Sequence, residues 1–165
     1  MRLRKGRLVH VAFALSVPLL LGPGCGFGSS TFTLVRASVD SDFMCPRGSN
    51  NASYDIHASA DAHNGTSNSV TIKAVTAVLT VASVHGPWLQ QVGSKYAAGT
   101  VSFKPANVGA GRDATLRVTI PSACTNYSGA STPVSYAEYR VTLTVTSSAG
   151  TNRIDSQNSH RITAA

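Results

Sequence analysis

The chain has 165 residues but very little glutamate, cysteine or tryptophan, and these shortages narrow the functions it can have. Glu138 is the single glutamate, which leaves few pairs of carboxyl groups of the kind that glycosidases use. A Gly-x-Ser-x-Gly motif for a nucleophilic serine is absent, and the glycine-rich turn at 109–111 has no helix pattern behind it that could bind phosphate. We therefore predict that the protein is not an enzyme and uses no cofactor.

Clustered positive charge is also missing, although the formal net charge is +7 at pH 7. Four of the 14 lysine and arginine residues fall within positions 1–7, and the others are scattered singly along the chain. Nucleic-acid binding needs neighbouring cations that displace several counterions together. The sequence therefore predicts no nucleic-acid partner.

The long apolar run of this chain lies at its N-terminus. Basic residues at positions 2–7 precede the run from Leu8 to Leu21, which ends in Gly22-Pro23-Gly24-Cys25. This order is typical of an export signal, which we assign to residues 1–24 and expect to be helical. The run holds about 14 residues, whereas a membrane span needs roughly 20. We therefore predict that the protein is exported.

Residues 19–25 resemble the lipobox of bacterial lipoproteins, because a small residue, Gly24, directly precedes Cys25. The resemblance implies that Cys25 carries a lipid, that the lipid anchors the protein to a membrane of the cell envelope, and that residues 25–30 form a tether. Two alternatives remain open: an ordinary signal peptidase cuts nearby and the protein is secreted, or the segment stays as an uncleaved anchor.

The composition of residues 31–165 favours one all-β domain, since threonine and valine are abundant and leucine is sparse after the signal. Alternation of apolar and polar residues predicts about seven strands, and a change of phase within the third predicts a bulge near Ala74. We expect an antiparallel sandwich of two sheets. The predicted strands are Thr31–Val39, Tyr54–Ala62, Val70–Val84, Thr100–Lys104, Ala114–Ile120, Ala137–Thr146 and Thr151–Ile162.

This strand count, together with the long final hairpin closed by Ser148-Ala149-Gly150, resembles bacterial immunoglobulin-like or fibronectin type III-like sandwiches. The resemblance covers residues 31–165 and implies an immunoglobulin-like fold. It departs from antibody domains, because Trp88 lies far after Cys45 and Ser122 stands where a tyrosine precedes the second cysteine. It therefore implies no function.

Cys45 and Cys124 form the remaining cysteine pair once Cys25 is assigned to the anchor. An oxidising compartment favours a disulfide between them. Because neither lies within a predicted strand, we expect the bond to clamp two loops. The alternative, a redox-active pair, lacks the Cys-x-x-Cys spacing.

Two groups of residues are candidates for binding. His57, Asp61 and His63 share the polar face of one predicted strand, so they are candidate metal ligands if a further ligand comes from elsewhere. Trp88 lies in a loop after Gly86-Pro87, where an aromatic side chain either closes the core or anchors a partner. Tyr96 and Tyr127 lie in other polar stretches and are candidates to join it.

Three asparagines, Asn51, Asn64 and Asn126, also match the N-glycosylation pattern, which would be incidental in a bacterial lipoprotein. From all these features we predict a non-catalytic binding or structural module of the cell envelope that engages a protein or glycan through loops or a sheet edge. The alternative is a small metal-binding accessory protein that uses the His57, Asp61 and His63 face.

Overall fold

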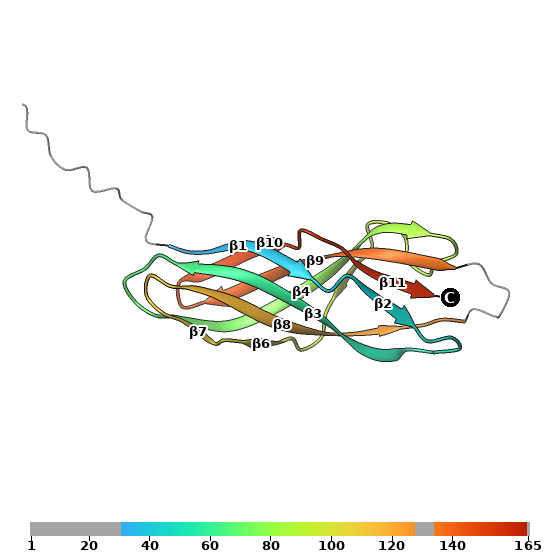
Figure 1. Ribbon diagram of the computed structural model, residues 1–165, viewed down its shortest axis with the longest axis horizontal. Helices are drawn as coiled ribbons and strands as arrows, with labels where there is room; N and C mark the ends of the chain where they lie inside the picture. The colour runs from blue at the N-terminus through green and yellow to red at the C-terminus, as the bar shows by residue number, and fades with distance from the viewer. Residues whose placement is uncertain (1–30, 128–133, 165) are drawn as a thin grey trace, which may run out of the picture.

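The computed structural model describes residues 31–127 and 134–164. The predicted signal, the candidate lipidation site Cys25 and the tether at 25–30 lie outside the described residues. The described part is built of strands (Figure 1). They are β1 Phe32–Val39, β2 Asp42–Cys45, β3 Ala52–Asn64, β4 Val70–His85, β5 Lys95–Ala97, β6 Ser102–Lys104, β7 Asn107–Val108, β8 Asp113–Cys124, β9 Ser135–Ser147, β10 Gly150–Asp155 and β11 His160–Ala164.

The strands form two sheets that pack face to face, as predicted. One sheet has the order β1-β3-β8-β6, and the other runs β2-β11-β9-β4-β5, with β10 beside β9 and β7 beside β4. These are the orders A-B-E-D and G-F-C of an immunoglobulin fold, with β10 and β11 together in the place of strand G. The fold is therefore an all-β, immunoglobulin-like sandwich.

The N-terminal strand region crosses between the sheets. β1 pairs with β3 in the first sheet, whereas β2 pairs with β11 in the second, and this β2–β11 pair is parallel. The expected antiparallel arrangement therefore holds in the other pairs of the described strands and is departed from at this edge. The predicted count of seven is also too low, because β2, β5 and β7 are too short to show alternation and β10–β11 was predicted as one strand.

The break between β10 and β11 has a side-chain cause. Ser156 is buried, its Oγ accepts a hydrogen bond from the Val141 nitrogen, and it donates to the Asn158 carbonyl. Asn158 in turn bonds both the nitrogen and the carbonyl of Val39 on β1. Ser156 thus stays bonded to Val141 of β9, while Gln157 and Asn158 connect the second sheet with β1 before pairing with β9 resumes at His160.

Alternation builds the core from both sheets, because successive side chains of a strand point to opposite faces. In β9, the alternate residues Tyr139, Val141, Leu143 and Val145 are buried, and in β3 the inward residues from Ile56 onward are buried too. A register shift between Ile72 and Ala74 confirms the predicted bulge in β4. It keeps the inward residues on both sides of the bulge facing the core.

β8 is longer than predicted, because Pro121 does not end it. Pro121 pairs with Asp55 of β3, while β6 pairs with β8 only as far as Thr119. At residue 121, therefore, β8 has a neighbouring strand on one side, and proline is tolerated on such an edge. The extension carries β8 on to Cys124.

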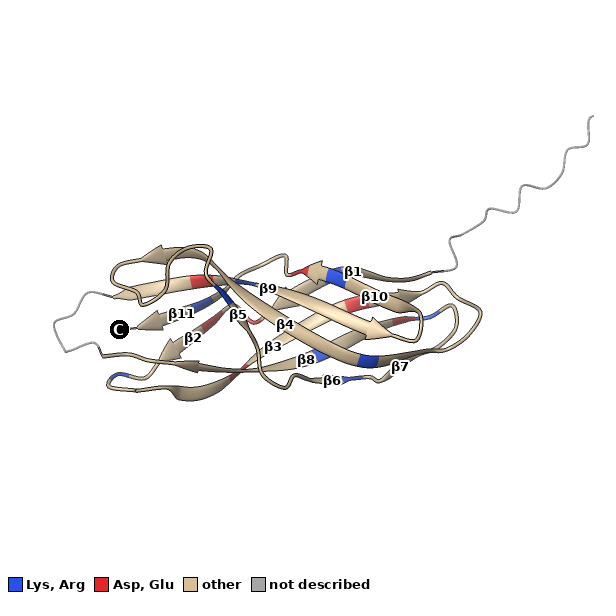
Figure 2. Ribbon diagram, turned by 180° about the vertical axis from the view of Figure 1, so that it is seen from behind, with Lys and Arg blue, Asp and Glu red and all other residues tan. Residues whose placement is uncertain are grey.

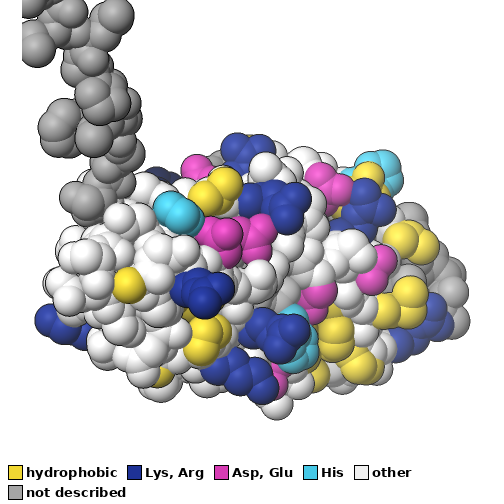
Figure 3. Space-filling view, turned by 60° about the vertical axis from the view of Figure 1, so that its left-hand side comes forward, with side chains coloured by type: hydrophobic (Ala, Val, Ile, Leu, Met, Phe, Trp, Pro, Cys, Tyr) yellow, Lys and Arg dark blue, Asp and Glu magenta, His cyan; other side chains and the backbone are white. Residues whose placement is uncertain are grey.

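In the coloured ribbon of the described residues, lysine and arginine positions are scattered over both sheets and interspersed with acidic positions (Figure 2). The face seen in Figure 3 has lysine or arginine side chains interspersed with acidic ones. Arg36 and Asp61, for example, pair across β1 and β3 at 2.9 Å. In the part of the chain that the structure describes, no helix is long and apolar enough to cross a membrane.

Candidate functional site

The predicted disulfide between Cys45 and Cys124 is present, with a Cα–Cα distance of 5.9 Å. Its expected position between loops is wrong: Cys45 is the last residue of β2 and Cys124 the last of β8. The bond therefore joins the two sheets at one end of the sandwich, and both cysteines are buried. We call this the disulfide end.

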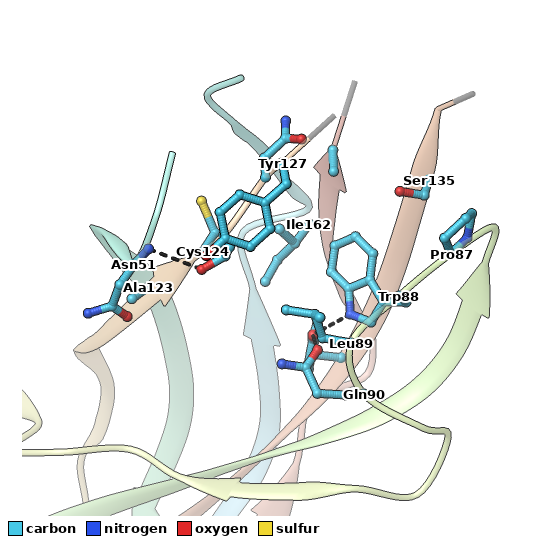
Figure 4. Close-up of a pocket in the computed structure, with 14 residues that line it drawn as sticks. Asn51, Pro87, Trp88, Leu89, Gln90, Ala123, Cys124, Tyr127, Ser135 and Ile162 are labelled. Carbon is cyan, nitrogen blue, oxygen red and sulfur yellow. Dashed lines mark hydrogen bonds between the residues drawn. The ribbon is translucent and has the colours of Figure 1, made fainter. Parts of the chain in front are cut away.

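A groove of about 480 Å³ opens beside the disulfide at this end (Figure 4). Its walls come from both sheets and from the loop between β4 and β5, so it lies where the two layers separate. The lining residues are Asn51, Pro87, Trp88, Leu89, Gln90, Ala123, Cys124, Thr125, Asn126, Tyr127, Ser135, Tyr139, Ile162 and Ala164. Its size falls within the roughly 300–1,000 Å³ of small-ligand sites.

Gly86 directs the β4–β5 loop that carries Trp88. Its φ of +72° lies in the region that favours glycine, and a Cβ on it would lie 3.0 Å from the Ser135 Cβ. The chain can therefore turn closely past β9 directly after His85. Pro87 follows and restricts the backbone, which places Trp88 over the end of the core.

Tyr139 fixes the orientation of this loop from below. The Trp88 Nε1 donates a hydrogen bond to the Tyr139 Oη at 3.1 Å, and the Tyr139 hydroxyl donates to the Gln90 Oε1 at 3.0 Å. Burial raises the pKa of Tyr139 above its ordinary value. One buried tyrosine thus holds both Trp88 and Gln90.

Tyr127 forms the facing side of the groove. Its ring is 72% exposed, and its hydroxyl donates to the Asn50 Oδ1 at 3.0 Å. The neighbouring Asn126 is buried and donates through Nδ2 to the Cys45 carbonyl, so the residue before Tyr127 is tied to the disulfide strand β2. Figure 4 shows the Trp88 and Tyr127 rings on opposite sides of the groove with Ile162 between them.

Of the three predicted aromatic residues, the structure therefore brings Trp88 and Tyr127 into one groove. Tyr96 lies on β5, opposite Leu79 of β4, and does not line it. The sequence reasoning missed Gln90 and Ser135 as groove residues. The Gly86-Pro87 turn was a signal for Gln90, whereas Ser135 reaches the groove through long-range packing that no local pattern shows.

The candidate metal ligands on β3 are each engaged with a different partner. His57 lies 3.6 Å from Asp40, His63 contacts Asp113 at 2.7 Å, and Asp61 binds Arg36 and Thr115. Hydrogen bonds from Thr115 and Arg36 hold the pKa of Asp61 below its ordinary value. Within residues 31–127 and 134–164, no group of three or more His, Cys, Asp or Glu side chains is placed to hold a metal ion.

A second group of polar residues, Asp40, His160 and Tyr54, brings a carboxyl, an imidazole and a hydroxyl group close together. The buried His160 bonds the Asp40 backbone carbonyl through Nδ1 at 2.9 Å, with the Asp40 Oδ1 at 3.2 Å, and its Nε2 lies 3.4 Å from the Tyr54 hydroxyl. Tyr54 is stacked on Phe43, and burial raises its pKa to about 12. A phenol that holds its proton so firmly is a poor nucleophile, so this set is better suited to linking β2, β3 and β11 than to catalysis.

Comparison with known proteins gives only distant likenesses. No family model matches the sequence, and no curated protein matches it. Among solved structures, AggA, the major subunit of aggregative adherence fimbriae type I from Escherichia coli, is 8% identical, with 81% of this chain and 95% of that chain covered and a TM-score of 0.37. PapD-like domain 7 of human CEP192 is 8% identical, with 94% of this chain and 95% of that chain covered and a TM-score of 0.29.

The CooA pilin subunit from enterotoxigenic Escherichia coli is 14% identical, with 79% of this chain and 98% of that chain covered and a TM-score of 0.26. At these identities and TM-scores the likenesses assign no family. The description of the fold therefore depends on the strands and pairings of the chain itself.

Proposed function

We propose that the protein is an exported, non-catalytic binding module of the cell envelope, and that it takes a partner protein or glycan into the groove at the disulfide end. The observation that carries this proposal is the pairing of Trp88 with Tyr127 across an open groove. Large aromatic side chains supply much of the binding energy in recognition sites, because they bury a wide apolar area with few rotatable bonds.

The construction of the groove supports binding rather than simple closure of the core. Trp88 is held by a hydrogen bond to a buried tyrosine, so little side-chain entropy remains to be lost when a ligand binds. Leu89 and Tyr127, at 76% and 72% exposure, are exposed apolar groups at the same groove. Adjacent exposed apolar side chains at a cavity are typical of interaction sites.

The disulfide supports a location outside the cytosol, since such bonds persist in oxidising compartments. We propose that Cys25, after removal of residues 1–24, carries the lipid that anchors the domain to a membrane through the short segment 25–30. Secretion without a lipid and retention of the segment as an uncleaved anchor are the alternatives. Mass spectrometry of the N-terminal peptide from exported protein separates the three, because only the first leaves a diacylglycerol on Cys25 and only the last leaves residues 1–24 attached.

Binding is tested with the labelled full chain, as the producing cell exports it, added to isolated cell envelopes. We expect saturable binding that Trp88→Ala weakens at least tenfold, because the main aromatic contact is lost. Tyr96→Ala is the matched control, since Tyr96 is an aromatic residue that does not line the groove. Binding that is not saturable, or that both variants weaken equally, would contradict the proposal.

A further inference from the structure

The groove differs from the outer faces of the sheets in the charge of its lining. Its 14 described lining residues include no lysine, arginine, aspartate, glutamate or histidine. A charged ligand group that entered would lose water without gaining an opposite charge, which is costly. The chemistry of the described lining therefore selects an uncharged ligand.

Uncommitted hydrogen-bonding groups lie in the groove beside the aromatic rings. Gln90 uses its Oε1 to accept from Tyr139, while its amide nitrogen has no partner among the described residues. The Ser135 hydroxyl also lines the groove and, within that same part of the chain, has no hydrogen-bond partner. The Gln90 amide nitrogen is thus available to a ligand without breaking any bond of the fold, and the buried Ser135 hydroxyl belongs to the wall of the groove.

From this combination we infer that the ligand is an uncharged pyranose glycan, an inference that rests on the proposed function. One face of a pyranose ring presents C–H groups that pack on an aromatic ring, while its edge presents hydroxyl groups that need neutral donors and acceptors. Trp88 and Tyr127 provide flat apolar surfaces, and Gln90 and Ser135 provide the neutral polar groups. An apolar side chain of a partner protein would leave both polar groups dehydrated and unpaired, which is unfavourable.

The first test is an array of immobilised oligosaccharides, both uncharged ones and ones that carry carboxylate, sulfate or phosphate groups, probed with the full exported chain. We expect binding to uncharged members, weakened at least tenfold by Trp88→Ala and roughly 3- to 10-fold by Gln90→Ala, which removes one hydrogen bond. Tyr127→Ala is a second variant that removes an aromatic side chain from the groove. Because Tyr127 is exposed, a loss of binding in this variant is not explained by unfolding. Tyr96→Ala should bind as the unaltered chain does. Preference for acidic members would overturn the inference.

The second test separates failure of this inference from failure of the proposed function. Isolated envelopes are treated either with periodate, which cleaves sugar diols, or with protease, and binding of the full chain is then measured. Binding that periodate abolishes and protease leaves intact supports a glycan ligand. Any other pattern overturns the inference, and Trp88-dependent binding that only protease removes would assign the groove to a peptide while leaving the proposed function in place. Envelope binding that does not depend on Trp88 would overturn both.

Discussion

Asn64 and Gln90 carry the same kind of side-chain amide at opposite ends of the β-sandwich, but the two amides are used differently. Asn64 follows the His63–Asp113 pair at one end of the β3–β8 ladder, while Cys124 and the groove lie at the other end. The Asn64 Nδ2 donates to the carbonyls of Asn68, Val108 and Gly109, and its Oδ1 accepts from the nitrogen and hydroxyl of Thr66. Every polar atom of this buried amide serves the fold.

At the disulfide end, by contrast, polar groups are left available. The Gln90 amide is held through its oxygen only, and the Ser135 hydroxyl faces the groove. One end of the sandwich is therefore closed by internal hydrogen bonds alone, whereas the other combines a covalent bond with hydrogen bonds such as that from Asn126 to the Cys45 carbonyl, and there the Gln90 amide nitrogen is not used by the fold. Asn64 matches the N-glycosylation pattern, but this asparagine is fully buried and its amide is used for packing.

Removing the covalent bond should have the largest effect. We expect the double variant Cys45→Ala, Cys124→Ala to lose about 4.5 kcal/mol of unfolding free energy, the chain-entropy value for a loop of this length. The two cysteines are 79 positions apart, so the reduced unfolded chain gains much freedom. Chemical denaturation of the full chain measures the loss. Ser49→Ala, which removes only the hydroxyl 3.2 Å from the Cys45 Sγ, is the control. A loss below about 1 kcal/mol would show that the disulfide end does not depend on its bond.

The closed end should be sensitive to Asn64→Ala. The substitution removes the side-chain donor shared by the carbonyls of Val108 and Gly109, which keep the Ser69 hydroxyl and the Arg112 nitrogen, and we expect a loss of about 1–3 kcal/mol of unfolding free energy. Denaturation in urea provides the measurement, and groove binding should stay unchanged. Asn68→Ala is the matched control, since Asn68 is exposed and contributes to this end mainly through its backbone carbonyl. If both variants lost the same unfolding free energy, the Asn64 amide would not be what closes this end of the sandwich.

Much of the sandwich could be predicted because alternation is a local property. The strict alternation in β3 and β9 gave their inward faces, and the change of phase at Ala74 gave a bulge that the structure contains. The short strands β2, β5 and β7 could not be found in this way, because two to four residues carry no period. The crossing of β1 into β2 between the sheets is likewise decided by long-range pairing with β11.

The groove could be predicted only in part. Trp88 and Tyr127 stood out as aromatic residues in polar stretches, but their meeting across the groove depends on the ends of β4 and β8 lying together. Tyr139 falls within the predicted strand Ala137–Thr146, yet its burial and the two hydrogen bonds of its hydroxyl follow from tertiary packing. Pairing of Cys45 with Cys124 followed from counting, whereas its place between sheets did not.

Buried tyrosines should make stability fall at alkaline pH. The pKa of Tyr54 is raised from 10.0 to about 12, so its contribution is fully present below pH 10 and is lost as the pH rises towards 12. Between pH 9 and 11 we expect the unaltered chain to lose roughly 1 kcal/mol more unfolding free energy than Tyr54→Phe does. Denaturation at both pH values gives the difference. Tyr127→Phe should behave as the unaltered chain, because its ring is exposed; a matching effect there would argue against burial as the cause.

The smallest effects are expected on the polar face of β3, where the side chains bind one another rather than a ligand. His57→Ala and His63→Ala each remove one exposed contact to an aspartate, so we expect changes in unfolding free energy within about 0.5 kcal/mol and unaltered groove binding. Thermal unfolding with and without added zinc extends the test, since a ligand that binds the folded state raises the melting temperature. Because these histidines have separate partners, zinc should shift the unaltered chain and the double variant equally. If zinc raised the melting temperature of the unaltered chain but not that of the double variant, this face would be a metal site. The groove would then no longer be the single candidate for function among the described residues.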